Sequence, residues 1–316
     1  MKKYISIMAA CALALSACTD YNDQFEGLAE LLEIKDIKAL EYTLTDADYA
    51  SMASSASAMT KDADLQTALK AAGTAKQFKD TDEAHELVPC FFAWTSGSFF
   101  TLSDTSTIKL TYNVAETEEG ETVITDQFER ANGVWKYNPS VVITLNPTRN
   151  DPFVTPYYQA VVDWVWEHVD EPSGVAYKSG NGYLDTYGTA DYYTGCSAYY
   201  NNVEMRPGTL RSKAPKVDSY QGADLVAAGI AFAGDCYSSL SDKEVSDLAT
   251  KRLCYVMGQV LSKMHADAAP VEGIEVTYTV NLVIFLGGTS PKSPTHSLVY
   301  KVVGPAEFEF VGIKEI

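Results

Sequence analysis

The sequence predicts an α+β protein with antiparallel sheets and segregated helices, arranged as two subdomains. Two observations predict this class. Alternating apolar and polar residues, the pattern of a half-buried strand, occur in runs such as 107–112 and 297–303. Apolar residues at helical spacing occupy other stretches, such as 156–169 and 242–265. Because the strands follow one another instead of alternating with helices, a parallel α/β sheet is not expected.

Residues 1–17 are predicted to be a signal peptide that is removed. Two lysines precede an apolar stretch at 4–15, which is too short to span a bilayer. The Leu-Ser-Ala-Cys run at 15–18 resembles a lipobox, where bacterial lipoprotein precursors are acylated on the cysteine and cut before it. An ordinary cleavable signal peptide is the alternative. The sequence therefore predicts lipidation, such as palmitate, at Cys18.

The mature chain is expected to be anchored to the bacterial outer membrane through Cys18, at the cell surface. Residues 18–36 form an acidic tether, and acidic residues just after a lipidated cysteine resemble surface-export signals of the Bacteroides group. Loss of the two signal-peptide lysines leaves 22 of the 24 basic residues against 42 acidic ones, a net charge of about −20. Such a charge argues against nucleic acid as a partner.

The N-terminal α+β region is predicted to span 37–170. Thr45 and Asp46 are candidate caps for a first helix, and a second helix is expected over 62–72, ending at Gly73. The remaining elements of this region are expected at 107–112, 123–128 and 134–145 as strands and at 156–169 as a helix.

The C-terminal α+β region is predicted to span 171–316 and to contain a tyrosine-rich loop at 181–202. Ser241 and Glu244 have the spacing of a capping box at the start of the helix over 242–265. Strands are then expected at 275–286, 297–303 and 307–313.

Short runs at 23–28, 42–49, 110–113 and 133–141 resemble a group of uncharacterised Bacteroides-type surface lipoproteins. The resemblance covers about residues 20–169, and its motifs are packing and turn patterns. Such lipoproteins often accompany polysaccharide-uptake or adhesion systems. The resemblance therefore implies binding at the cell surface and carries over no catalytic residue.

Motifs for catalysis, metals and cofactors are absent from the sequence. It has no Gly-x-Ser-x-Gly elbow, no phosphate-binding glycine loop and no dinucleotide fingerprint, so no catalytic residue and no cofactor are predicted. The four histidines are scattered. Four cysteines remain after Cys18, and their spacing does not suit a zinc site. Two disulfides among them are conceivable, but Cys90 and Cys254 lie in apolar patterns that favour free, buried thiols. The four are Cys90, Cys196, Cys236 and Cys254.

Tyrosines are dense in one short segment. Interleaved with Asn and Asp, they suit a glycan site, because aromatic faces stack on sugar rings while amides and carboxylates bond the hydroxyl groups. They also suit a protein contact, and the alternative is that they only pack the loop onto the body. The six candidate ligand-binding residues are Tyr183, Tyr187, Tyr192, Tyr193, Tyr199 and Tyr200.

Three functional hypotheses follow. The first is a non-catalytic surface lipoprotein that binds a neutral glycan or a protein partner. The second is an envelope glycan-processing hydrolase, which would need two carboxylates facing each other across a cleft. The third is a structural component of a surface assembly, which would show an exposed apolar patch or an open sheet edge.

Overall fold

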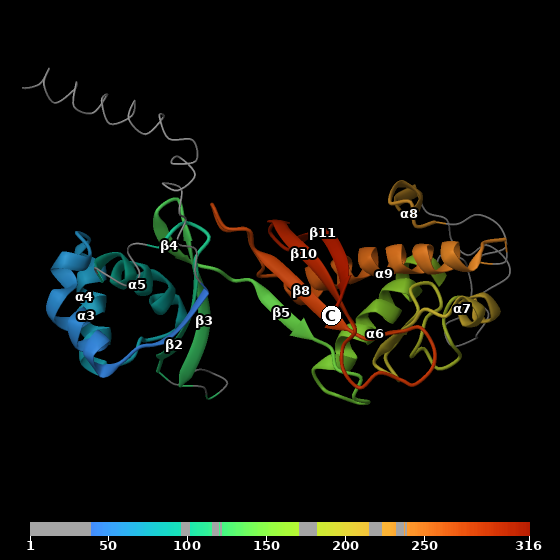
Figure 1. The fold of residues 1–316 in the computed structure, drawn as a ribbon, viewed down its shortest axis with the longest axis horizontal. Coiled ribbons are helices and arrows are strands. Elements are labelled where there is room, and N and C mark those ends of the chain that lie inside the picture. Colours follow the sequence, from blue (N-terminus) through green and yellow to red (C-terminus); the bar gives the residue numbers. More distant parts are fainter. Residues whose placement is uncertain are drawn as a thin grey trace, which may run out of the picture. The chain divides into compact units, whose positions relative to one another are not determined.

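The computed structural model describes residues 39–95, 102–115, 120, 122–170, 182–214, 223–231, 237 and 239–316. The chain divides into two compact units, Met1–Asn138 and Pro139–Ile316, which Figure 1 colours from blue to green and from green to red. The division comes earlier than the expected boundary at 170. The reason is that residues 141–144, just after Asn138, pair with residues 278–281 of the second unit.

The α+β class is confirmed, but the sheets are mixed and not purely antiparallel. Each of the three sheets in the described residues contains one parallel pair at an edge: β1 with β2, β5 with β8, and β7 with β9. Parallel pairing needs a long connection between the strands. Local alternation in the sequence does not reveal such a distant partner.

The first unit is a four-stranded sheet in the order β1-β2-β3-β4, with three helices on one face (Figure 1). Its core is apolar, and within it the ring of Phe92 packs edge to face on Phe128 and tilted on Trp135. Phe78 packs edge to face on Tyr112 in the same core. Its elements are β1 (Ala39–Thr43), α3 (Asp46–Met59), α4 (Ala63–Ala75), α5 (Thr81–Trp94), β2 (Thr107–Asn113), β3 (Val123–Ala131) and β4 (Val134–Tyr137).

Gly73 does not end its helix, as the sequence suggested, but lies inside α4. A Cβ at this position would come within 2.4 Å of the backbone N of Ala53 and of the carbonyl oxygen of Tyr49 in α3. The glycine therefore allows two helices to approach closely. Lys76 ends α4 in the left-handed conformation with φ 57°. Capping at the start of α3 is confirmed, because Thr45 and Asp48 form a capping box.

Helix α5 was not predicted, because Pro89 interrupts its pattern. The helix nevertheless runs through the proline, and its apolar side chains pack against the sheet. It is fixed to the sheet by His85, which stacks on Tyr137 at 3.5 Å between ring centroids. The Nε2 atom of His85 also lies 2.7 Å from the carboxylate of Asp126 on β3, which accepts a hydrogen bond from the Tyr112 hydroxyl as well.

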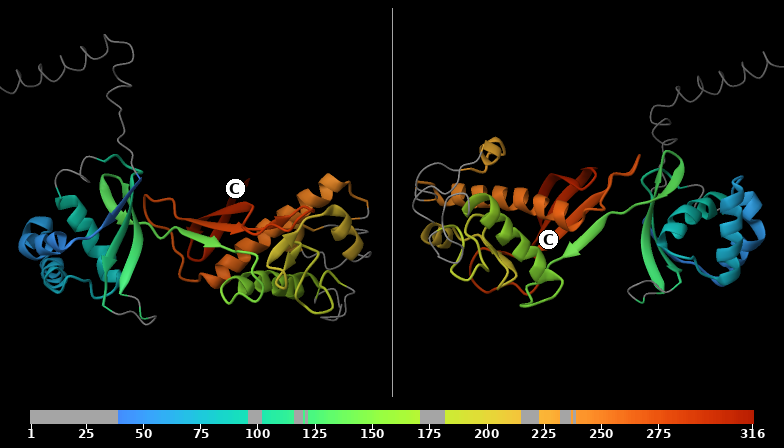
Figure 2. Two further views of the ribbon diagram at one scale, coloured as in Figure 1. Left: turned by 60° about the horizontal axis from the view of Figure 1, so that its bottom comes forward. Right: turned by 180° about the vertical axis from the view of Figure 1, so that it is seen from behind.

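The second unit contains the sheet β11-β10-β8-β5 and a small sheet β6-β7-β9. Helices α6 and α9 lie side by side in it (Figure 2). Its elements are β5 (Val141–Thr144), α6 (Val154–Val165) with a π-helical turn η1 (Trp166–Asp170), β6 (Cys196–Ser197), β7 (Asn202–Glu204), α7 (Pro207–Lys213), α8 (Ala223–Ala227), α9 (Asp242–Met264), β8 (Thr277–Leu282), β9 (Ile284–Phe285), β10 (His296–Gly304) and β11 (Glu307–Glu315).

The apolar run at 134–145 is two strands, not one. Its halves, β4 and β5, belong to different sheets and different units. Proline cannot donate a hydrogen bond to a strand ladder, so Pro139 suits the gap between them. The expected strand at 275–286 is likewise divided into β8 and β9.

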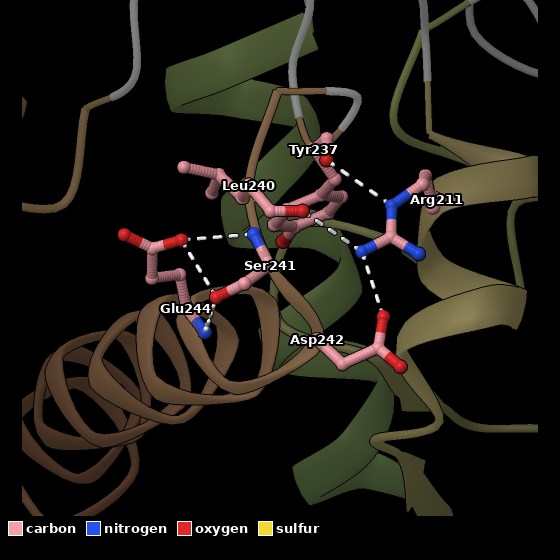
Figure 3. A network of polar contacts seen from close by, with 6 residues as sticks. All are labelled: Arg211, Tyr237, Leu240, Ser241, Asp242 and Glu244. Carbon is pink, nitrogen blue, oxygen red and sulfur yellow. Dashed lines mark hydrogen bonds and ion pairs between the residues drawn. The ribbon is translucent and has the colours of Figure 1, made fainter.

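The start of α9 is fixed by the polar network of Figure 3. Ser241 and Glu244 form the predicted capping box, which is therefore confirmed. Arg211 of α7 donates to the carbonyl oxygens of Tyr237 and Leu240 and to the carboxylate of Asp242, the last at 2.9 Å. The guanidinium thus ties α7 to the beginning of the longest described helix. No helix in the described residues is long and apolar enough to cross a membrane.

The carboxylate of Asp126, which contacts both His85 and Tyr112, gives a testable prediction. Substitution of Asp126→Ala should destabilise the protein by roughly 1–3 kcal/mol, because the Tyr112 hydroxyl then loses its acceptor in a buried setting. Denaturant unfolding measures this loss. Thr125→Ala, on the exposed face of the same strand, is the control and should change stability by less than about 0.5 kcal/mol. Equal effects of the two substitutions would contradict the proposed role of Asp126.

Candidate functional site

The structure separates the six tyrosines into two groups. Tyr183 and Tyr193, which the sequence predicted as ligand-binding residues, are buried, with 1% and 2% of their surface exposed, so neither ring offers an accessible face to a ligand. The other four reach the surface: Tyr192 is half-buried, and Tyr187, Tyr199 and Tyr200 are exposed. Tyr192 and Tyr193 are neighbours in a bend of the chain, yet the first is half-buried and the second is buried.

The buried tyrosines surround a cation. Arg252 of α9 is 1% exposed, and its guanidinium lies 4.0 Å from the ring centroid of Tyr193 and 5.7 Å from that of Tyr183. It donates to the carbonyl oxygen of Ile230 at 2.7 Å and to the hydroxyl oxygen of Tyr237 at 2.9 Å. Burial acts to lower the pKa of Arg252, but the three neighbouring tyrosines raise it above its usual value. The charge therefore persists inside the unit and holds the tyrosine-rich segment against α9.

Two buried aspartates give this segment its shape. Asp170, at the end of η1, accepts hydrogen bonds from the backbone N–H groups of Tyr183 and Leu184. Asp191 accepts from the backbone N–H groups of Tyr193 and Thr194 and from the Thr194 hydroxyl. Both carboxylates satisfy backbone donors that would otherwise be buried without partners.

Gly195 closes the turn that follows Asp191. Its φ is +83°, and a Cβ there would come within 2.2 Å of the Glu204 carbonyl oxygen. Only glycine combines this backbone conformation with so close an approach. Gly195 leads directly into β6, which pairs antiparallel with β7 through the turn at 198–201.

The exposed tyrosines line a hollow of about 570 Å³, which we name the tyrosine hollow. Its polar groups are the side chains of Asp185, Thr189 and Ser197 and the hydroxyl groups of the tyrosines. Burial, followed by the charges of nearby acidic residues such as Asp185, raises the pKa of Tyr192. The Tyr192 hydroxyl is therefore neutral at pH 7. The hollow is lined by Asp185, Tyr187, Thr189, Ala190, Tyr192, Ser197, Tyr199 and Tyr200.

Two rings of the tyrosine hollow are held by a third side chain that the sequence analysis missed. Tyr199 and Tyr200 pack edge to face at 4.8 Å, and the guanidinium of Arg149 lies 4.5 Å and 4.9 Å from their centroids. Arg149 also donates to the Tyr199 hydroxyl at 3.3 Å. Nothing in the sequence indicated this contact, because fifty residues separate the partners.

A second hollow of about 310 Å³ adjoins the first, and we name it the Glu204–Arg206 hollow. The two share Ala190, Tyr192, Ser197 and Tyr200 as lining residues. Arg206 pairs with Glu204 through Nε and Nη2, with its shortest contact at 2.6 Å, and lies 4.7 Å from the ring centroid of Phe285. The two charges of the pair largely offset each other.

The carboxylates that line the two hollows are engaged in structural bonds. Asp185 accepts from the backbone N–H groups of Thr189 and Ala190, Asp191 caps its own turn, and Glu204 is bound to Arg206. A hydrolytic pair needs one carboxylic acid and one carboxylate free to reach the scissile bond. These contacts favour ligand binding over hydrolysis.

The described cysteines, Cys90, Cys196 and Cys254, are free thiols. Cys196 and Cys254 are buried, and Cys90 is half-buried, contrary to the expectation that it lies in the interior. Burial raises the pKa of Cys254 to about 12, so this thiol is unreactive. Cys236 and the predicted lipidation site Cys18 lie outside the described residues. Within the described ranges, no three His, Cys, Asp or Glu side chains come together as metal ligands.

No protein-family model matches the chain, and no curated protein or solved structure matches it significantly. The resemblance to Bacteroides-type surface lipoproteins therefore stays a prediction from short motifs.

The buried Asp191 gives a prediction on pH. Burial, partly offset by hydrogen bonds from Thr194, raises its pKa to about 7. The folded state thus favours the protonated acid, and this contribution to stability is complete below the usual pKa near 3.8 and is lost as pH rises through about 7.

Asp191→Asn removes this titration and keeps an oxygen that can accept from the turn. Relative to the unsubstituted protein, the variant should gain stability between pH 4 and pH 7.5, by roughly 1 kcal/mol or more. Denaturant unfolding at a series of pH values measures the difference. A difference that is independent of pH would contradict the raised pKa.

Proposed function

We propose that this protein is a non-catalytic surface lipoprotein that binds a neutral glycan in the tyrosine hollow. The observation that carries the proposal is the set of four accessible tyrosines around one concave site: Tyr187, Tyr192, Tyr199 and Tyr200. Aromatic faces stack on the apolar faces of sugar rings, and the neighbouring hydroxyl and carboxylate groups suit the hydroxyl groups of a sugar.

The shape of the site favours a glycan over a protein partner. A hollow of about 570 Å³ is within the range of small-molecule pockets, whereas protein contacts are broad and flatter. Tyr199 and Tyr200 are held by Arg149 before any ligand arrives. Less conformational entropy is then lost on binding. The acidic chain would also repel polyanions, which supports a neutral ligand.

Anchoring at the outer membrane through Cys18 belongs to the same proposal. Its support is the order of features at the start of the chain: two lysines, an apolar stretch and a Leu-Ser-Ala-Cys run. A lipid anchor would hold the glycan site at the cell surface and keep it next to the bilayer without a membrane-spanning segment.

A second candidate function is a structural role in a surface assembly. Strand β11 is at the edge of its sheet as far as the described strands extend, and it exposes apolar side chains. Val311 is 59% exposed, and Phe310 and Ile313 are 40% and 38% exposed. Edge strands with exposed apolar residues are sites of pairing between chains. A glycan screen without binding would favour this candidate.

The glycan proposal is tested by a glycan-array screen of the purified full chain, followed by calorimetry with the sugar that binds. Tyr187→Ala and Tyr200→Ala should each weaken binding by about tenfold, because a stacked ring contributes roughly 1–2 kcal/mol. Their melting temperatures should change little, since both rings are exposed.

Phe153→Ala is the matched control, because this ring is 55% exposed and lines neither hollow. It should leave affinity unchanged. Tyr193→Ala should instead lower the melting temperature strongly, because loss of a buried ring costs about 3–5 kcal/mol. Unchanged affinity in both Tyr187→Ala and Tyr200→Ala would refute the glycan site.

The anchor is tested by Cys18→Ala in the full chain. We expect the native protein to fractionate with membranes and to carry fatty acids at this thiol. The variant should lose both properties, because no acyl chain can be attached. Mass spectrometry of the amino terminus and fractionation measure them. A native protein with an intact amino terminus upstream of Cys18 would contradict the anchor.

A further inference from the structure

We propose that the Glu204–Arg206 hollow is a second sugar subsite, so that the ligand is a neutral oligosaccharide of at least two units lying across both hollows. This inference rests on the proposed function. It goes further by assigning a role to residues outside the tyrosine hollow and by setting a minimum length for the ligand.

The first step is that the two hollows adjoin each other. Ala190, Tyr192, Ser197 and Tyr200 line both. Their volumes are about 570 Å³ and 310 Å³. A ligand stacked on Tyr192 or Tyr200 therefore lies next to both hollows. A single sugar unit would occupy only one of the two.

The second step is the chemistry of the adjoining hollow. Arg206 uses Nε and Nη2 to bind Glu204, which leaves Nη1 to donate to a ligand. The arginine side chain is 45% exposed and that of Glu204 is 18% exposed. Because the Glu204 carboxylate pairs with the guanidinium, an anionic ligand would meet no net positive charge. The hydroxyl groups of a neutral sugar can instead bond to Arg206, to the amide of Asn202 and to the hydroxyl of Thr209.

The third step is rigidity. Glu204 belongs to β7, which pairs with β6 on one side and β9 on the other. Its carboxylate also accepts from the backbone N–H of Arg206 at 2.9 Å, and the guanidinium rests on Phe285 of β9. Because these contacts hold the guanidinium of Arg206 in place, it loses little conformational entropy when it donates to a sugar hydroxyl group. Such a preorganised donor suits a contact that determines specificity.

The experiment compares ligands of different length. Titration calorimetry of the full chain would use glucose, maltotriose and cellotriose, with mannose and mannotriose as a second series. At least one trisaccharide should bind about tenfold or more tightly than its own monosaccharide, because it adds hydrogen bonds in the second hollow.

The substitutions Arg206→Ala and Asn202→Ala change only the Glu204–Arg206 hollow, and Tyr187→Ala changes only the tyrosine hollow. The first two should remove the advantage of the trisaccharide and leave monosaccharide affinity unchanged. Tyr187→Ala should weaken both ligands. Arg206→Ala and Asn202→Ala are independent, so a folding defect in one leaves the other as the test.

Two results would overturn the inference, and they differ in what they say of the proposed function. Equal affinity for mono- and trisaccharide, with no effect of Arg206→Ala or Asn202→Ala, would leave a glycan site with one subsite only. No binding of any sugar in the series or on the array would overturn the glycan proposal and this inference together.

Discussion

The guanidinium of Arg252 is enclosed by the second unit, and its surroundings must compensate a charge that cannot be removed by loss of a proton. In the described residues, its contacts are tyrosine rings, a hydroxyl and a carbonyl oxygen. These partners come from segments distant in sequence. Because Tyr183 and Tyr193 must face this cation, the rest of the segment between them is oriented, and Tyr187 and Tyr192 are directed toward the surface. The burial of one arginine thus determines which tyrosines remain accessible.

The carboxylates of Asp170 and Asp191 complete this arrangement. Each accepts backbone hydrogen bonds in a segment with little regular secondary structure. Irregular backbone is stable in the interior only when its polar groups are paired. The tyrosine-rich segment is therefore an ordered platform within its described part. This order explains how exposed rings such as Tyr199 and Tyr200 can keep a fixed geometry with Arg149 at the surface.

Binding and catalysis place different demands on the same residue types. A hydrolase must leave its carboxylates free to exchange protons, whereas Asp185, Asp191 and Glu204 are all bonded to groups of their own segment. The aromatic side chains show the reverse pattern, because the rings of the tyrosine hollow keep exposed faces. Accessible rings next to carboxylates that already accept structural hydrogen bonds favour ligand binding over hydrolysis. The same reasoning separates this region from the first unit, where His85, Asp126 and Tyr112 bond to one another and fix a helix to a sheet.

Local chemistry allowed the sequence to predict much of the secondary structure. The predicted helix cap at Thr45 and the predicted capping box at Ser241 depend on residues within one turn, and the alternation in β2 and β10 depends on neighbouring residues. The sequence by itself also determined the acidic charge and the pattern that predicts lipidation at Cys18. Helix α5 was not predicted because proline disfavours the interior of a helix. The packing of the apolar side chains of α5 overrides this local preference of Pro89.

Only the tertiary structure decided the division at Asn138, the parallel pairs at the sheet edges, and which tyrosines are buried or exposed. Tyr192 and Tyr193 have the same chemistry and adjacent positions, so composition cannot distinguish them. They differ because the guanidinium of Arg252, about sixty residues later in the chain, packs on the ring of Tyr193 and not on that of Tyr192. Such long-range contacts depend on how separate elements pack, and a local pattern carries no information about them.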